Sequence, residues 1–221
     1  MNLSTIEQET GSDPRFSVIW LHGLGADGND FAPIVPELVA SSWPAIRFVF
    51  PNAPVRPITI NGGTPMRAWF DILNFDREQT PDEAGIRESI ASLEALIARE
   101  NQRGIPSERI LLAGFSQGGA IVLEGGLRHP QRLAGIVALS TWLPGIGDLD
   151  READTANRQT PVFWGHGSAD PVVQPAWGRQ SRDRLQALGL PVSWHEYPIG
   201  HHVCSPEITD LQAWLAQRLA D

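Results

Sequence analysis

The pentapeptide Gly114-Phe115-Ser116-Gln117-Gly118 is the part of the sequence with the clearest chemical meaning. It stands between an apolar segment typical of a strand and a segment typical of a helix, the setting in which G-x-S-x-G forms a sharp turn that exposes a serine. The turn strains the serine backbone, and the glycines let neighbouring chain approach closely. The hydroxyl then lies at a helix N-terminus, where developing negative charge is favoured. A Gly-rich turn with an incidental serine fits this flanking pattern less well, so we predict that Ser116 is a nucleophile.

A serine hydroxyl is a poor nucleophile near neutral pH, so a base must take its proton and a third group must orient that base. After a turn of this type the expected chain order is Ser, then Asp or Glu, then His. Asp170 follows an apolar segment, and His201 lies between the last predicted strand and the last predicted helix. Both loops should open at the same edge of a parallel sheet as Ser116. We therefore predict Asp170 as the orienting acid and His201 as the base.

Each of these assignments has a simpler alternative. Asp-Pro is a common turn opener, so Asp170 alone means little. The pair His201-His202 could bind a metal, but no second carboxylate or cysteine cluster with ligand spacing accompanies it, and we predict no metal site. We expect structural roles, as a strand residue, a helix cap and a loop hydrogen-bonding group, for His195, His129 and His166.

Two backbone N–H groups must stabilise the oxyanion of a tetrahedral intermediate, each worth ~10²–10³ in rate where measured. The residue after the nucleophile, Gln117, provides one of them in a turn of this kind. The other is expected in the loop after an early strand. Leu24 is flanked by Gly23 and Gly25, which allow its amide to turn inward. A Gly-rich turn needed only for folding is the alternative; we predict Leu24 and Gln117 as the oxyanion hole.

The elements that must position these residues alternate between strand and helix, which predicts an α/β fold with a mostly parallel central sheet and helices on both faces. The predicted strands are 16–21, 47–50, 109–113, 133–139, 161–164 and 192–197. The predicted helices are 31–40, a helix that begins near Thr80-Pro81 and ends at Gly104, then 117–127, 175–188 and 206–219, the last capped by Ser205. Only about twenty residues separate Leu139 from Pro161, an ordinary connection with no room for a lid domain.

The segment 51–81 has no convincing periodicity and is rich in Pro and Gly. Loops of this length are uncommon in compact domains and are usually functional or disordered. Its apolar side chains, Met66, Trp69, Phe70 and Phe75, argue against disorder. We predict that this segment is a substrate-binding loop.

Composition sets limits on the kind of protein. A chain of 221 residues suits one domain, 1–221, and its formal net charge of −9 without a basic cluster argues against a nucleic-acid partner. The N-terminus lacks the features of a signal peptide, and no apolar run approaches the ~20 residues that span a bilayer. The single cysteine, Cys204, excludes an internal disulfide and suits a reducing compartment. We expect a cytoplasmic protein without stable membrane insertion.

Taken together, the motifs resemble those of the acyl-protein thioesterase and small carboxylesterase family, also called the phospholipase/carboxylesterase family. The similar segments are 21–27 (LHGLGAD), 51–54 (PNAP), 60–63 (INGG), 67–71 (RAWFD), 113–120 (AGFSQGGA), 139–144 (LSTWLP), the Asp170 segment and 197–201 (YPIGH). The likeness runs from about Phe16 to the C-terminus. It implies an α/β-hydrolase fold without a lid, the triad Ser116, Asp170 and His201, the Leu24 and Gln117 amides as oxyanion hole, no cofactor, and a weak homodimer. His202 stands where relatives often have Ser or Glu.

We therefore expect a serine esterase that hydrolyses carboxylic esters of short to medium acyl chains, and acyl thioesters, through an acyl-enzyme. The acyl chain should lie along the apolar side chains Trp69, Phe70, Trp142 and Leu143, because an apolar tail needs an apolar trough. The alternatives are a dedicated acyl-protein thioesterase (depalmitoylase), a lysophospholipase, and a non-catalytic binding protein on a hydrolase scaffold. The last alternative is disfavoured because such proteins typically lose a triad member. The expected partner is a small or lipid-like acyl ester.

Overall fold

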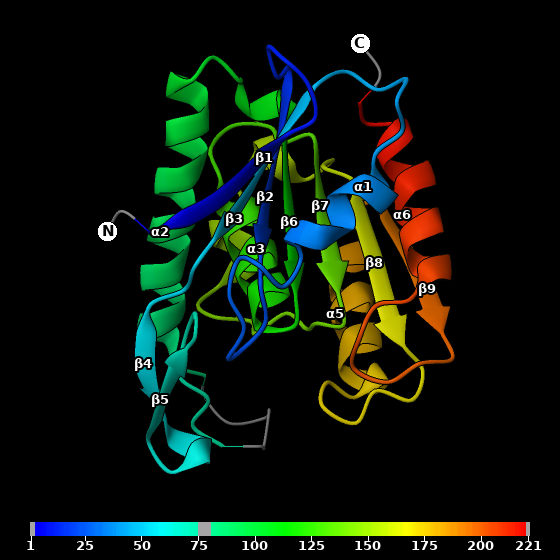
Figure 1. Ribbon diagram of the computed structural model, residues 1–221. Helices are drawn as coiled ribbons and strands as arrows, with labels where there is room; N and C mark the ends of the chain where they lie inside the picture. The colour runs from blue at the N-terminus through cyan, green and yellow to red at the C-terminus, as the bar shows by residue number, and fades with distance from the viewer. Residues whose placement is uncertain (1–2, 75–80, 220–221) are drawn as a thin grey trace.

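The computed structural model describes residues 3–74 and 81–219. Its centre is a sheet of seven strands in the order β1-β3-β2-β6-β7-β8-β9 (Figure 1). The strands of this sheet are β1 (Thr5–Glu9), β2 (Phe16–Leu21), β3 (Ile46–Pro51), β6 (Ile110–Phe115), β7 (Gly135–Leu139), β8 (Val162–Gly167) and β9 (Val192–Tyr197). All neighbouring pairs are parallel except β1 and β3. The predicted mostly parallel sheet is confirmed.

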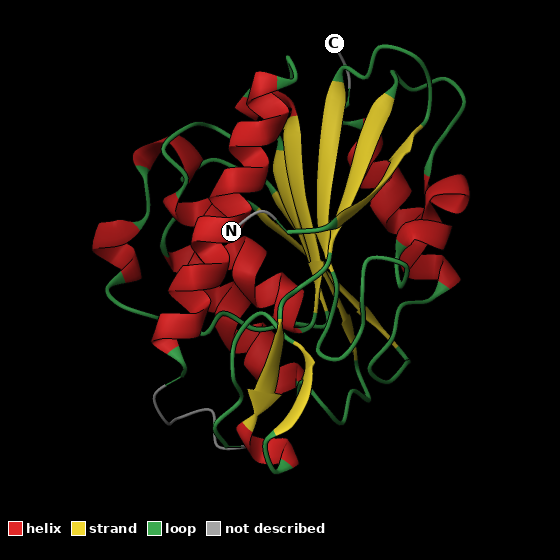
Figure 2. Cartoon of the chain, turned by 60° about the vertical axis from the view of Figure 1, so that its left-hand side comes forward, coloured by secondary structure: helices red, strands yellow, loops and turns green. Residues whose placement is uncertain are grey.

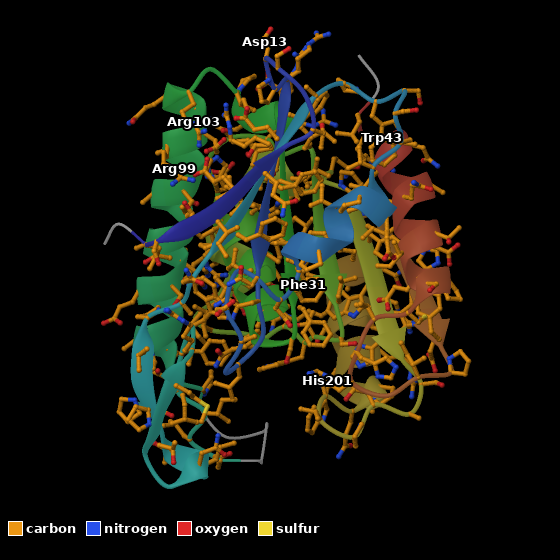
Figure 3. The ribbon with its side chains drawn as sticks, in the orientation of Figure 1. Asp13, Phe31, Trp43, Arg99, Arg103 and His201 are labelled. Atoms are coloured by element: carbon orange, nitrogen blue, oxygen red, sulfur yellow. The ribbon has the colours of Figure 1, made fainter. Side chains whose placement is uncertain are left out.

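The antiparallel edge strand β1 was not expected from the sequence, because Thr5–Glu9 is polar and short. Ion pairs hold it against a distant helix, α2 (Glu83–Gln102). The Glu7 carboxylate lies 2.9 Å from both the Arg99 and the Arg103 guanidinium groups. Figure 3 shows both arginines on α2 beside this strand. These contacts join residues more than ninety positions apart, and local sequence patterns carry no signal for them.

Helices cover both faces of the sheet (Figures 1 and 2). On one face lie α2, α3 (Gln117–Arg128) and α5 (Pro175–Ala187), and on the other α1 (Val35–Leu38) and α6 (Ser205–Ala216). Alternation along β2 explains the two layers: Ile19 and Leu21 join the first cluster, whereas Val18 and Trp20 join the second. Within the described ranges no helix combines the length and apolar character needed to cross a bilayer.

Three helices differ from the predicted ones by more than one residue in their bounds or in the residue that caps them. The segment 31–40 forms a 3₁₀ turn, Ala32–Ile34, followed by the single turn of α1, because Pro33 and Pro36 cannot donate backbone hydrogen bonds. The N-cap of α2 is Asp82, whose side chain accepts from the Gly85 N–H at 3.0 Å. The predicted cap, Thr80, lies outside the described residues. Helix α6 runs from Ser205 to Ala216 where 206–219 was predicted, and Cys204 rather than Ser205 is its N-cap.

The segment 51–81 contains regular structure that its sequence did not indicate. Strands β4 (Val55–Ile58) and β5 (Thr64–Arg67) form an antiparallel hairpin closed by the 3₁₀ turn Thr59–Asn61. Gly62 and Gly63, with φ of +64° and +77°, make the turn possible. Phe75, one of the apolar residues noted in this segment, is outside the described residues.

The connection between β7 and β8 holds only the short helix α4 (Leu149–Glu152) and the 3₁₀ turn Thr155–Asn157.

Candidate active site

Ser116 stands in the turn between β6 and α3 with φ of 53° and ψ of −119°, a strained conformation for a residue with a side chain. Two close backbone contacts explain the flanking glycines. A Cβ at position 114 would lie 2.5 Å from the Gly118 backbone, and one at position 118 would lie 2.4 Å from the Leu21 carbonyl oxygen. The Ser116 N–H donates to the Leu139 carbonyl at 2.9 Å, which fixes the turn against β7.

The structure brings Ser116, His201 and Asp170 into one chain of hydrogen bonds. His201 Nε2 lies 3.0 Å from Ser116 Oγ, and His201 Nδ1 lies 2.7 Å from Asp170 Oδ2. The other carboxylate oxygen, Oδ1, accepts from the N–H groups of Val172 and Val173 at 2.8 and 2.9 Å. Burial alone would raise the pKa of Asp170, but the hydrogen bonds from His201 and Val173 outweigh it and hold that pKa below its ordinary value.

The two adjacent histidines have different surroundings. His201 packs its ring against Phe115, with 4.8 Å between ring centroids, and Figure 3 shows it at the end of the sheet where the parallel strands terminate. His202 is exposed. The hydrogen bonds to Ser116 and Asp170 therefore come from His201 and not from His202.

A third histidine, His166, binds the backbone of the loop that carries Asp170. It lies in β8, not in a loop as expected, and is fully buried. Its Nε2–H donates to the Val173 carbonyl at 2.9 Å, and its ring stacks on Trp194. Burial lowers the pKa of His166, so the ring is neutral at pH 7. It holds the turn whose amides bind Asp170.

The loop of Leu24 lies beside the nucleophile. A Cβ added to Gly23 would lie 3.5 Å from Ser116 Cβ, so Leu24 follows a residue in close contact with Ser116. His22 fixes this loop: its Nε2 accepts from the Ala53 N–H at 3.0 Å, which leaves the proton on Nδ1 to donate to the Gly23 carbonyl at 2.7 Å. Burial lowers the pKa of His22, in keeping with a neutral ring. Sequence reasoning missed this positioning role.

Gln117 is the first residue of α3, where a backbone N–H has no partner within the helix. Trp69, expected to contact an acyl chain, lies in the core instead, with 1% of its surface exposed. Its Nε1–H donates to the His22 carbonyl at 2.8 Å. Trp69 therefore does not line the apolar trough, contrary to the prediction. It is a core residue that binds the backbone at the start of the loop of Leu24.

The other three apolar residues predicted to bind substrate do meet at one cavity. Phe70, Trp142 and Leu143 line a solvent-open cavity of about 120 Å³. The rings of Phe70 and Trp142 stand edge to face, 6.1 Å apart. The remaining lining residues are Asp71, Ile72, Leu73, Asn74, Pro81, Asp82, Pro144, Trp177, Gln180 and Ser181.

The remaining two histidines are bound elsewhere. His129 contacts the Glu94 carboxylate at 2.8 Å and Ser107 Oγ at 3.3 Å, in addition to standing at the C-cap of α3. His195 lies in β9, where its ring stacks on Phe163. Both positions agree with the structural roles expected for them.

Residues 3–219 match the family described as Phospholipase/Carboxylesterase. The chain belongs to this family. Proteins similar in sequence to this chain include several named acyl-protein thioesterase 1. The one from Mycosarcoma maydis is 41% identical over 95% of this chain and 94% of its own length, and one from Cryptococcus neoformans is 39% identical over 92% of each chain.

Solved structures of similar proteins agree with the fold. The crystal structure of Arabidopsis thaliana SOBER1 superposes with a TM-score of 0.88 at 31% identity, covering 93% of this chain and all of that one. Zea mays acyl-protein thioesterase 2 gives a TM-score of 0.84 at 28% identity over 98% of this chain and 99% of its own. The α/β-hydrolase fold is confirmed, and this phospholipase/carboxylesterase family member is a serine hydrolase of the carboxylesterase and thioesterase type.

Proposed function

We propose that this hydrolase cleaves carboxylic esters of short to medium acyl chains, and acyl thioesters, with Ser116 as nucleophile. The observation that carries the proposal is the unbroken hydrogen-bonded series from Asp170 through His201 to Ser116. A buried carboxylate, an imidazole bonded at both nitrogens and a strained serine at a helix N-terminus form an arrangement suited to acyl transfer. A non-catalytic role would not require all three groups at these distances.

In the proposed mechanism His201 Nε2 accepts the Ser116 proton while Ser116 Oγ attacks the acyl carbonyl carbon. Asp170 accepts from Nδ1–H, keeps the ring in the required tautomer and stabilises the imidazolium. The oxyanion is held by the N–H groups of Leu24 and Gln117. His201 then returns the proton to the alcohol or thiol that leaves. A water, deprotonated by the same imidazole, attacks the acyl-enzyme, and Ser116 regains its proton as the acid departs.

The acyl chain would occupy the cavity beside Phe70, Trp142 and Leu143, because these side chains offer the apolar surface that it needs. The cavity is also lined by polar groups, Asn74 and Gln180 among them, which limit the length of a purely apolar chain. The name acyl-protein thioesterase 1, carried by the relatives reported above, favours a second candidate, a dedicated acyl-protein thioesterase (depalmitoylase). A lysophospholipase activity is the third.

The proposal extends to the setting of the enzyme. We propose that residues 1–221 act as one domain without a cofactor or metal, in the cytoplasm, and that any homodimer is weak. The single cysteine, Cys204, supports a reducing compartment. Light scattering over a range of protein concentrations would measure the oligomeric state.

The central test is Ser116→Ala. It removes a single oxygen atom at the end of β6, so the fold should persist while hydrolysis of p-nitrophenyl esters is lost. A fluorophosphonate probe should label the native protein at one site and the variant not at all. Ser92→Ala, on the surface of α2, is the matched control and should keep both properties. Labelling that survives Ser116→Ala would refute the assignment.

The choice of substrate needs a separate measurement. kcat/KM for p-nitrophenyl esters and for acyl thioesters of rising chain length would separate an esterase for short to medium chains from a depalmitoylase. A maximum at medium chains, with comparable rates for esters and thioesters, supports the main proposal. A steep rise toward palmitoyl thioesters would favour the second candidate.

A further inference from the structure

Two charged residues, one fully buried and one mostly buried, stand one turn apart in α3, the helix that begins directly after the nucleophile. Glu124 is fully buried, and the Arg128 side chain keeps only 11% of its surface exposed. They form an ion pair. Neither residue has a part in the proposed acyl transfer, and both occupy a helix whose other residues are mostly apolar and buried.

Both side chains bind one loop segment, 142–146, at backbone atoms. Glu124 Oε1 accepts from the N–H groups of Gly145 at 2.6 Å and Ile146 at 3.4 Å. Arg128 Nη2 donates to the Ile146 carbonyl at 2.8 Å. Arg128 Nε also reaches the Glu152 carboxylate at 2.8 Å, which adds a tie to α4. One ion pair thus satisfies three backbone groups of the segment.

The same segment is the wall of the cavity proposed to hold the acyl chain. Trp142, Leu143 and Pro144 line that cavity. At its start, the segment is bonded through Thr141, whose Oγ1 donates to the Ser116 carbonyl at 2.6 Å. At its middle, the Leu143 N–H donates to Ser181 Oγ at 2.9 Å. Glu124 and Arg128 hold the far end, where Gly145 takes a φ of +70°.

A buried ion pair is a poor source of stability, because desolvation of the charges offsets their attraction and apolar residues of similar volume often serve as well. We therefore attribute the effect of this pair to the backbone groups of Gly145 and Ile146 that it binds. Without it, the buried Ile146 backbone would lose its partners and the segment would have to rearrange, since an unpaired buried polar group costs about 1–3 kcal/mol.

We propose that Glu124 and Arg128 are positioning residues that set the selectivity for acyl-chain length by fixing the wall formed by Trp142 and Leu143. The inference rests on the proposed esterase function and deepens it: the pair acts on the substrate only through the loop. The contacts that join Ser116, His201 and Asp170 involve neither Glu124 nor Arg128.

The test compares Arg128→Met with Arg151→Met. Arg151 also forms an ion pair, with Asp148, but its side chain is 87% exposed in α4, so the control makes the same charge change without touching the wall. For Arg128→Met we expect kcat/KM toward an octanoyl ester to fall by about tenfold or more, and toward an acetyl ester by less than about threefold. Fluorophosphonate labelling should stay near the native rate. Arg151→Met should leave kcat/KM unchanged for both esters.

A general loss of structure would lower kcat/KM for both esters together. If kcat/KM falls equally for both esters in a variant that is still folded, the inference is overturned. Glu124→Gln provides a second variant that keeps the side-chain volume and an acceptor oxygen but removes the charge; it should shift the octanoyl-to-acetyl ratio in the same direction, by less. An unchanged ratio in both variants would equally refute the proposed role.

Hydrogen exchange of the native protein gives a readout that needs neither variant to fold. The Gly145 and Ile146 amides should exchange as slowly as amides of the neighbouring sheet, and exchange at the rate of an open loop would contradict the inference. Trp142→Ala tests the assignment of the acyl cavity separately from the positioning role of Glu124 and Arg128. If it leaves the chain-length profile unchanged, the acyl cavity itself is misassigned; if it shifts the profile and Arg128→Met does not, only the positioning role fails.

Discussion

The side chain of Gln117 joins the first turn of α3 to the backbone of Phe70, because its Nε2 donates to the Phe70 carbonyl oxygen at 2.7 Å. Its Oε1 accepts from the neighbouring Trp69 N–H at 2.8 Å. One buried amide therefore ties the residue after the nucleophile to the segment that lines the cavity. Its backbone and its side chain serve two different parts of the site.

Gln117→Leu should lower the free energy of unfolding by roughly 2–4 kcal/mol, because it leaves the Trp69 N–H and the Phe70 carbonyl buried without their partner. It should also reduce kcat/KM, since Phe70 is no longer held against the helix. Urea unfolding and ester kinetics would measure both. Gln186→Leu, at an exposed position of α5, is the control and should change neither by a comparable amount.

The adjacent histidines allow a sharp test of the site. His201→Ala should lower kcat on the order of 10⁴-fold or more, leaving a residual rate from the oxyanion hole and binding. His202→Ala should keep kcat within about threefold, because its exposed ring lies outside the bonded series. Steady-state kinetics decide, with circular dichroism to establish folding. The reverse order of effects would mean that the base is assigned one residue too early.

Asp170→Asn should reduce kcat on the order of 10³–10⁴-fold by favouring the wrong tautomer of His201. It should also change how stability depends on pH. The pKa of Asp170 is lower in the folded protein, so its ionised form contributes stability above the unfolded value of about 3.9, and this contribution is lost as the pH falls through the folded value. The difference in unfolding free energy between native and variant proteins should therefore shrink below about pH 4. A difference that is constant from pH 7 to pH 3 would contradict this assignment.

Glu207 predicts a pH dependence of the opposite sign. It is buried at the start of α6 beside Gly165 of β8, and burial raises its pKa from 4.5 to about 7. Between these values the unfolded chain releases a proton that the folded chain keeps, so the residue costs stability increasingly as the pH rises from 4.5 to 7. The full cost is on the order of 3 kcal/mol.

Glu207→Gln should remove this dependence and stabilise the protein at pH 8 more than at pH 4, as urea unfolding at the two pH values would show. Glu37→Gln, at an exposed position of α1, is the control. Equal effects of Glu207→Gln at both pH values would mean that the carboxyl is not protonated in the folded protein at neutral pH.

The parts of the site that follow from local pattern were predictable from the sequence. Ser116 is marked by its glycines, and Asp170 and His201 by the order in which they follow two strands of a parallel sheet. Because parallel strands end at one edge, chain order alone brings these residues together. The strand Phe16–Leu21 was likewise visible as a short apolar run before a Gly-rich loop, and the helix Pro175–Ala187 as a segment that ends before Gly189.

The parts that depend on contacts between distant residues were not predictable. Trp69 reads as an apolar loop residue, and only the packing of its loop against His22 makes it a buried support. Glu124 and Arg128 read as an ordinary pair at helical spacing, since nothing local reveals that they meet Ile146. Strand β1 pairs with β3, and its Glu7 contacts Arg99 and Arg103; a polar pentapeptide carries no sign of partners so far away.

The catalytic residues follow strands at different positions in the sheet, one central and one at the edge. Ser116 follows β6, which has β2 and β7 as neighbours, whereas His201 follows β9, the last strand of the sheet. Strands at a margin open locally at a lower free energy than central ones. Gentle heating should therefore separate the imidazole from the serine while the core still holds, so that activity is lost reversibly before cooperative unfolding begins. Thermal tolerance of the catalyst would then depend on the docking of α6 and β9 more than on the depth of the core.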